Sequence, residues 1–199
     1  MKFRFTHITY IAAALVFLTM CNACSDDFVD INSQDENSED YFNSEADYQN
    51  ALIGAYDLLQ ASYVNVMLGE IASSNTLAGG ESAIDVPGFQ QIDNMTHTPQ
   101  NDNLRDVWNW MFAGVNRANF ILEFKDKTDF PNRNNVIGQA TFLRAYYYFE
   151  LTKFFGDVPL AVDKRLLFGD QNEVDRTPRA EVYAQIEMDL QFAIDNLPA

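Results

Sequence analysis

Apolar residues recur at spacings of three and four over most of the chain beyond residue 43. This spacing places them on one face of an α-helix. It predicts four long helices, over residues 44–59, 104–122, 136–154 and 177–197. A shorter helix is expected over residues 64–72, where Gly69 interrupts the apolar run. No stretch of useful length after the N-terminal segment alternates as a strand does, so the pattern predicts an all-α fold of packed helix pairs.

Residues at the ends of the predicted helices support these boundaries. Ser44 followed by Asp47 has the spacing of a capping box. Either Asn101 or Asp102 is expected to cap the second long helix. The remaining signals are Gly156 and Pro159, which end the third helix, and Thr177 with Pro178, which form the cap and first turn of the last.

The apolar period fails between residues 73 and 103, where glycine, proline and small polar residues predominate. We expect a long irregular loop there, and such loops are commonly functional or disordered. Its aromatic and polar side chains are of the kinds that contact ligands, although we favour the simpler interpretation that they are ordinary loop residues. The side chains concerned are Phe89, Gln90, Gln91, Asp93 and Asn94.

The first twenty residues have the pattern of an export signal. Lys2 and Arg4 precede an uncharged, largely apolar run over residues 8–20. A bilayer-spanning helix needs about 20 apolar residues, whereas the apolar part of a secretory signal has roughly 7–15. The run therefore favours a signal peptide over an uncleaved membrane anchor.

Two cysteines, Cys21 and Cys24, follow this run directly. A redox role would require a folded setting that lowers the thiol pKa, which an export segment does not provide. The segment instead resembles the lipobox of bacterial lipoproteins, in which cleavage precedes a cysteine that becomes acylated. Cys24 fits best because Ala23 is small, whereas cleavage before Cys21 would follow the bulky Met20. We therefore predict a signal peptide over residues 1–23 and a lipid, such as palmitate, on Cys24.

Acidic residues dominate the chain. It carries 13 Lys and Arg against 29 Asp and Glu, for a formal net charge of -16. This charge argues against nucleic acid and anionic lipid surfaces as partners, because both are bound through basic residues. Two cysteines and two histidines argue against a disulfide scaffold or a multi-histidine metal site, and the sequence indicates no cofactor.

Nine of the acidic residues lie between Cys24 and Asn50, without a single Lys or Arg. We expect residues 24–43 to form a solvated acidic tether that precedes a helical domain over residues 44–199. Ser25, Asp26 and Asp27 also resemble the surface-export signal of Bacteroidetes lipoproteins. A surface-exposed, lipid-anchored position on the cell outer membrane follows as an expectation.

One block of sequence is specific enough to suggest a family. Residues 142–151 read FLRAYYYFEL and residues 154–160 read FFGDVPL. This block closely resembles the hallmark of the SusD/RagB family. Residues 108–122, which include Asn116 and Asn119, resemble the family's preceding helix, and residues 176–198 resemble its next one. The resemblance runs from about Cys24 to the end of the sequence.

The resemblance carries implications for fold and function. Members of the family are surface lipoproteins of Bacteroidetes that bind glycans, and in some cases peptides. They form a lid on a SusC-like TonB-dependent transporter and help to deliver ligand to it, and their fold consists of tetratricopeptide-like helix pairs. Members are much longer than 199 residues, so this chain is expected to correspond to an N-terminal portion. No residue of the long loop matches a family binding motif closely enough to take over a role.

The hallmark helix also permits an interpretation from its chemistry alone. Arg144 is expected to stack on aromatic rings or to pair with an acid such as Glu150. Tyr146, Tyr147 and Tyr148 cannot all face one way, and we favour core packing over ligand contact for them.

Trp108 and the last helix give two further expectations about packing. Trp108 lies on the most regular apolar stripe and is predicted to be buried against the helix that holds Leu143 and Tyr147. The last predicted helix has an apolar face that needs a cover. Either it folds back on the earlier helices, or its partner lies in a continuation of the chain.

Two other functions compete with ligand binding for a transporter. A glycoside hydrolase needs two carboxylates about 5–10 Å apart across a cleft, which a sequence cannot reveal. Neither a Gly-x-Ser-x-Gly nor a His-Glu-x-x-His motif occurs, so no catalytic residue is predicted. A helical-repeat scaffold that binds another protein at the cell surface would share the helical pattern but not the hallmark.

Overall fold

The computed structural model describes residues 38–82, 84–162, 164–167, 169–170 and 174–198. The chain divides into two compact units, Met1–Tyr41 and Phe42–Ala199. Within the first unit only α2 (Ser38–Tyr41) is described. The predicted signal peptide, Cys24 and most of the acidic tether lie outside the described residues.

The second unit consists of helices. They are α3 (Glu45–Asp57), the 3₁₀-helix η2 (Leu58–Ala61), α4 (Ser62–Ala72), α5 (Pro87–Asp93), α6 (Asp102–Glu123), α7 (Arg133–Phe155) and α8 (Arg179–Asn196). The described residues contain no strand, and their single isolated β-bridge joins Val158 to Thr177. The prediction of an all-α fold is confirmed.

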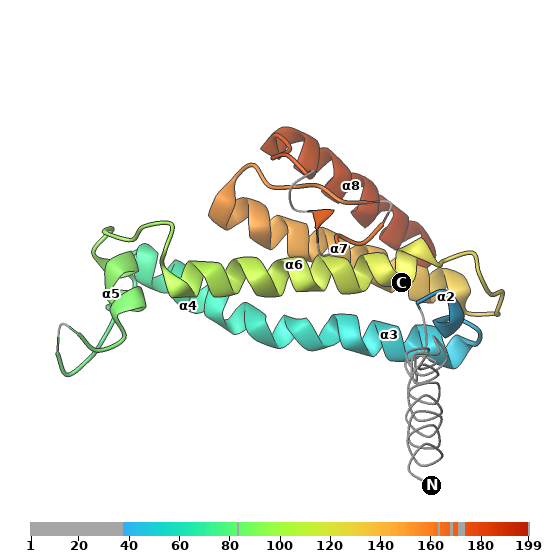
Figure 1. The fold of residues 1–199 in the computed structure, drawn as a ribbon, viewed down its shortest axis with the longest axis horizontal. Coiled ribbons are helices and arrows are strands. Elements are labelled where there is room, and N and C mark those ends of the chain that lie inside the picture. Colours follow the sequence, from blue (N-terminus) through green and yellow to red (C-terminus); the bar gives the residue numbers. More distant parts are fainter. Residues whose placement is uncertain (1–37, 83, 163, 168, 171–173, 199) are drawn as a thin grey trace, which may run out of the picture. The chain divides into compact units, whose positions relative to one another are not determined.

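Successive helices of this unit pack in antiparallel pairs. The α3–η2–α4 run forms one line, and α6 returns along it in the opposite direction (Figure 1). Helix α7 packs against α6 and α3, and α8 packs against α7. The buried side chains of α6 and α7, which include Met111, Val115, Leu143 and Leu151, form the centre of the core.

Two of the predicted helix starts are confirmed by their hydrogen bonds. The Ser44 N–H donates to Asp47 Oδ2 at 2.7 Å, as a capping box requires. Asn101 Oδ1 accepts from the Leu104 N–H at 3.2 Å, so Asn101, and not Asp102, caps α6.

The structure also shows where the hallmark helix α7 ends and where α8 begins. Helix α7 ends before Gly156, whose φ of +70° suits glycine. Helix α8 begins at Arg179, with Pro178 at the N-cap and not in the first turn as expected. The Arg179 N–H donates to Asp157 Oδ1 at 2.8 Å, so a residue 22 positions earlier supplies part of the cap.

The prediction of an uninterrupted irregular loop over residues 73–103 is wrong, because this stretch contains α5. Pro87 occupies the first turn of α5, a position that lacks a hydrogen-bonding requirement for its nitrogen. Ile92 anchors the helix and is buried. Pro87 followed by apolar residues at 89 and 92 was therefore a short helical signal, obscured by its polar flanks.

Two of the three tyrosines of the hallmark are buried in the core and the third is half-buried, which agrees with the preference for core packing. Tyr147 and Tyr148 are fully buried, and the Tyr147 hydroxyl donates to the Ala55 carbonyl at 2.6 Å. Tyr146 is half-buried and its hydroxyl donates to Ser62 Oγ at 2.7 Å. Core packing therefore accounts for Tyr147 and Tyr148, whereas Tyr146 lies at the edge of the core.

Trp108 is less buried than the sequence predicted. It is half-buried, and its ring contacts Phe112 and Phe155, with centroid distances of 4.7 and 5.0 Å. The fully buried stripe of α6 contains Val107, Met111, Val115, Ala118 and Ile121. Trp108 thus packs against α7, the helix that holds Leu143 and Tyr147, as predicted, but it lies at the edge of the buried face, so the prediction that it is buried is wrong.

The last helix folds back on the earlier ones, which was one of the two alternatives. Val182, Ile186 and Ala193 are buried in the contact of α8 with α7. Other apolar side chains of α8 remain exposed, with exposed fractions of 60% for Met188 and 71% for Ile194.

Candidate functional site

The polar side chains of the 73–103 stretch hold that stretch together. Gln90 Nε2 donates to the carbonyls of Ser82 and Asp85, at 2.9 and 2.6 Å. Asp93 Oδ2 accepts from the Ala78 N–H at 3.1 Å. Gln91 Oε1 accepts a hydrogen bond from Asn101 Nδ2, and Asn94 Nδ2 donates to the Gln90 carbonyl. Phe89 is half-buried. Four of the five candidates thus belong to α5 and not to a loop, and the polar groups among the five are engaged in contacts within the protein.

Arg144, the charged residue of the hallmark, is buried and fully engaged. Its Nε and Nη2 donate to the two carboxylate oxygens of Asp189, both at 2.7 Å. Its Nη1 donates to Asn119 Oδ1 at 3.0 Å and to the Val162 carbonyl at 2.7 Å. This bidentate ion pair fixes the position of α7 relative to α8. It also gives the buried guanidinium and the buried carboxylate an opposite charge to pair with.

The expected pairing of Arg144 with an acidic residue is therefore confirmed, but the acid is Asp189 and not Glu150, which the sequence suggested as an example. Glu150 is buried on another side of α7, where it accepts from Lys153 Nζ at 2.6 Å and from Asn65 Nδ2 at 2.8 Å. Six residues along a helix separate it from Arg144, which turns the two side chains to different faces. The acid that pairs with Arg144 is 45 positions away on α8.

The segment after α7 lies along α6 and α7 and is held there by their side chains. Asn116 forms a two-way pair with the backbone of Leu166, at 2.8 and 2.9 Å. Asn119 Nδ2 donates to the carbonyl of Ala161 at 2.9 Å, and the Ala161 N–H donates to the Tyr148 hydroxyl at 2.7 Å. Burial raises the pKa of Tyr148 to about 12. The polar side chains of α6 and α7 thus provide hydrogen-bond partners for backbone N–H and C=O groups of a segment that forms no regular secondary structure.

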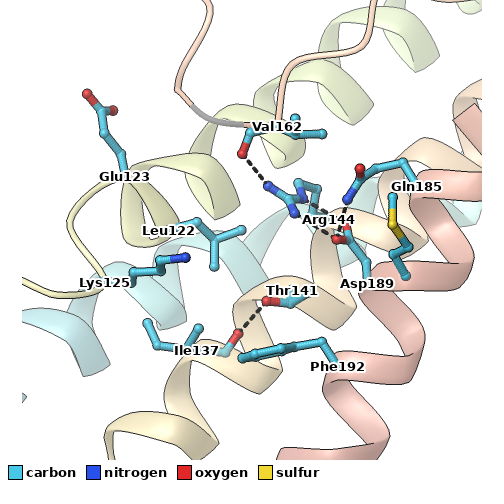
Figure 2. A pocket seen from close by; sticks show the side chains of 11 residues that line it. Leu122, Glu123, Lys125, Ile137, Thr141, Arg144, Val162, Gln185, Asp189 and Phe192 are labelled. Carbon is cyan, nitrogen blue, oxygen red and sulfur yellow. Dashed lines mark hydrogen bonds and ion pairs between the residues drawn. The ribbon is translucent and has the colours of Figure 1, made fainter.

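A cavity of about 490 Å³ lies beside the Arg144–Asp189 pair, between α6, α7 and α8. Figure 2 shows Arg144 between the Val162 carbonyl and Asp189, with Phe192 below them. Thr141, which also lines the cavity, already donates to the Ile137 carbonyl at 2.8 Å. The polar groups of Arg144, Asp189 and Thr141 in this cavity are therefore engaged in contacts within the protein.

Two further properties concern the described part of the chain. It holds no group of three or more His, Cys, Asp or Glu side chains with the geometry of a metal site. It also lacks any helix that combines the length and the hydropathy of a membrane span.

Comparisons with known proteins give a consistent result. A SusD-like family model, described as starch-binding and associating with the outer membrane, matches residues 27–199. Two curated SusD-like proteins of Formosa agariphila are 27% and 30% identical to this chain, over 98% and 80% of its length. The matches cover 38% and 32% of these relatives, so the chain spans about a third of their length.

Solved structures resemble the chain to a similar extent. A laminarin-binding SusD-like protein is 29% identical, with a TM-score of 0.66, over 79% of this chain and 35% of its own. Surface glycan-binding protein A from Bacteroides uniformis is 28% identical, also with a TM-score of 0.66, over 76% of this chain and 34% of its own. The helical arrangement described above is therefore shared with proteins whose names refer to glycan binding.

Proposed function

Since this chain belongs to the SusD-like family, we propose that it is part of a glycan-binding protein of the outer membrane that passes its ligand to a SusC-like TonB-dependent transporter. The observation that carries the proposal is the similarity to a laminarin-binding SusD-like protein, in sequence and in fold together. A peptide ligand is the alternative that the family resemblance leaves open.

A lipid on Cys24 would supply the link to the membrane. Residues 24–43 would then separate the anchor from the helical unit, and their acidic residues would keep this tether solvated. Stable anchoring requires more than one acyl chain, as on a fully processed lipoprotein. We place the helical unit at the cell surface, where it meets both the ligand and the transporter.

The proposed role is binding without catalysis. The polar groups of the hallmark helices are occupied by internal contacts, as at Arg144 and Asn119. Aromatic side chains that retain exposed surface, such as Trp108 and Tyr63, offer faces of the kind that sugar rings contact. A glycoside hydrolase is the weaker alternative.

A glycan array with the full chain, and with a form that extends to the length of its relatives, tests the binding proposal. We expect retention of at least one polysaccharide without release of reducing ends. Release of shorter sugars from the retained glycan would favour the hydrolase, and retention of no glycan by either form would contradict the proposal.

Co-purification tests the partner. From outer membranes solubilised in mild detergent, we expect the tagged protein to bring down a large TonB-dependent transporter in near-equal amount. Recovery of a different protein partner, together with no glycan binding, would favour the helical-repeat scaffold.

A further inference from the structure

Two arginines near the start of α8 differ from the others in their surroundings. The remaining five arginines of the described residues each lie within 4.0 Å of a carboxylate; they are Arg105, Arg117, Arg133, Arg144 and Arg165. Arg176 and Arg179 form no ion pair or side-chain hydrogen bond with any residue that the structure describes. The chain has 29 acidic residues, yet neither of these two arginines pairs with a carboxylate that the structure describes. Their guanidinium groups therefore remain available to a ligand.

Both arginines line the same open hollow, which has a volume of about 900 Å³. The aromatic residues Phe155 and Tyr183 line it as well, and each is half-buried. The Tyr183 hydroxyl makes no hydrogen bond within the described part of the chain. The hollow therefore offers two cationic groups, a free hydroxyl and two partly exposed rings. Its size falls in the usual range of ligand sites.

The backbone around the hollow is held in place by the hallmark segment. The Thr177 N–H donates to the Val158 carbonyl at 3.0 Å, directly after Arg176. The Arg179 N–H donates to Asp157 Oδ1 at 2.8 Å. These hydrogen bonds hold the backbone at Arg176 and Arg179 in place before a ligand binds. Less backbone entropy is therefore lost on binding.

The charges in the hollow favour an anion over a cation. Among the described residues that line it, Asp157 is the one acidic residue, and its Oδ1 accepts a hydrogen bond from the Arg179 N–H. The helix start is therefore already capped and is not itself the binding group. Planar guanidinium groups bind carboxylates and sulfates through paired hydrogen bonds. Because the acidic body repels anions, such a ligand needs local cations, whose effect reaches about 8 Å at physiological salt.

We propose that this hollow, lined by Arg176, Arg179, Phe155 and Tyr183, binds an anionic polysaccharide through its carboxylate or sulfate groups. The arginines hold the anionic group, and the aromatic rings contact the apolar face of the sugar. The inference rests on the proposed glycan-binding function and assigns the chemical class of the ligand.

The test uses Arg176→Gln, Arg179→Gln and the double variant of the full chain, with Arg105→Gln as a matched control. Arg105 is also exposed, on α6, and loses the same charge. The probes are alginate, dextran sulfate, neutral laminarin and poly-glutamate, compared by affinity electrophoresis at two salt concentrations. Because Arg176 and Arg179 are exposed, we expect all variants to keep the wild-type melting temperature.

We expect the wild-type chain to bind alginate or dextran sulfate more tightly than laminarin. The double variant should lose about tenfold or more of that affinity, because charge-assisted hydrogen bonds are lost, whereas Arg105→Gln should keep it. A preference for alginate identifies a carboxylate ligand, and a preference for dextran sulfate identifies a sulfate ester.

Several outcomes would overturn the inference. Equal loss of affinity in Arg105→Gln and in each of the single variants, which lose the same single charge, would reveal a general charge effect. Poly-glutamate binding as tight as that of the polysaccharides would reassign the hollow to acidic peptides. Binding of laminarin alone would reject the anionic ligand and leave the proposed glycan-binding function intact, whereas binding of no polysaccharide would contradict both.

Discussion

The ring of Tyr147 on α7 lies directly against the backbone of Gly114 on α6. A Cβ atom built on Gly114 would stand 2.6 Å from Cδ2 and Cε2 of that ring. Glycine is therefore required here by the close approach of the two helices, while its φ is that of an ordinary helix. This contact positions Tyr147 so that its hydroxyl donates a hydrogen bond to the Ala55 carbonyl of α3.

The substitution Gly114→Ala should destabilise the protein. The new methyl group has to displace a fully buried ring, and overpacking of this kind costs about 1–3 kcal/mol. Urea unfolding, followed by circular dichroism, measures the change in the free energy of unfolding.

Gly69→Ala provides the control for this prediction. Gly69 is an exposed residue inside α4, and a Cβ atom there would have no atom within 4 Å. Alanine is preferred over glycine in a helix interior by about 0.5–1 kcal/mol, so this variant should be more stable than the wild type. Equal stability of Gly114→Ala and Gly69→Ala would mean that α6 and α7 are not as close as described.

Loss of Arg144 should destabilise the fold far more than loss of an exposed arginine. Arg144→Gln leaves the carboxylate of Asp189 buried without its charge partner, and such a change typically costs about 3–5 kcal/mol. Arg105→Gln removes an arginine whose side chain is 59% exposed and pairs with Asp102, so it should cost less than about 1 kcal/mol.

Chemical denaturation of both variants measures this difference. If Arg144→Gln cost no more than Arg105→Gln, the guanidinium would have to be solvated in solution. A role for Arg144 in ligand contact would then replace the structural one.

Tyr148 should make the protein sensitive to alkali. Its pKa is raised from 10.0 to about 12, with burial as the main cause. The stabilisation tied to the protonated hydroxyl is fully present below pH 10 and is lost as the pH rises from 10 towards 12. In that window the slope is about 1.4 kcal/mol per pH unit for this group.

Urea unfolding at a series of pH values between 8 and 12 measures that slope. Tyr148→Phe should be less stable at neutral pH, because the Ala161 N–H loses its acceptor, and its stability should fall less steeply above pH 10. Burial raises the pKa of Tyr147 in the same direction, so part of the slope should remain. An unchanged slope in Tyr148→Phe would contradict the assignment.

The sequence was sufficient to predict the long helices and most of their ends. The apolar period of α6, α7 and α8 and the capping residues Ser44 and Asn101 act within a few positions, so they can be read locally. The burial of Trp108 was overestimated, because the buried face of a helix has an edge and a shift of one residue around the helix decides which side chains are covered.

The contacts that define the polar sites could not be read in the same way. Asp189 pairs with Arg144 across 45 positions, and Asp157 caps α8 across 22. Which of 29 acidic residues meets a given arginine depends on how the helices pack. For the same reason, the hollow of Arg176 and Arg179 emerges only when the start of α8 is placed beside the end of α7.

The proposed attachment of the chain to a membrane depends on one residue, Cys24, and can be tested directly. We expect Cys24→Ala to release the protein from membranes or to leave an unprocessed precursor, because acylation requires the thiol of the cysteine that follows the cleavage site. Cys21→Ala lies three residues earlier within the predicted signal peptide and should remain membrane-bound, which makes it the matched control. Metabolic labelling with a fatty-acid analogue, followed by membrane fractionation, distinguishes the two. Label that persists in Cys24→Ala and disappears in Cys21→Ala would move the anchor to Cys21.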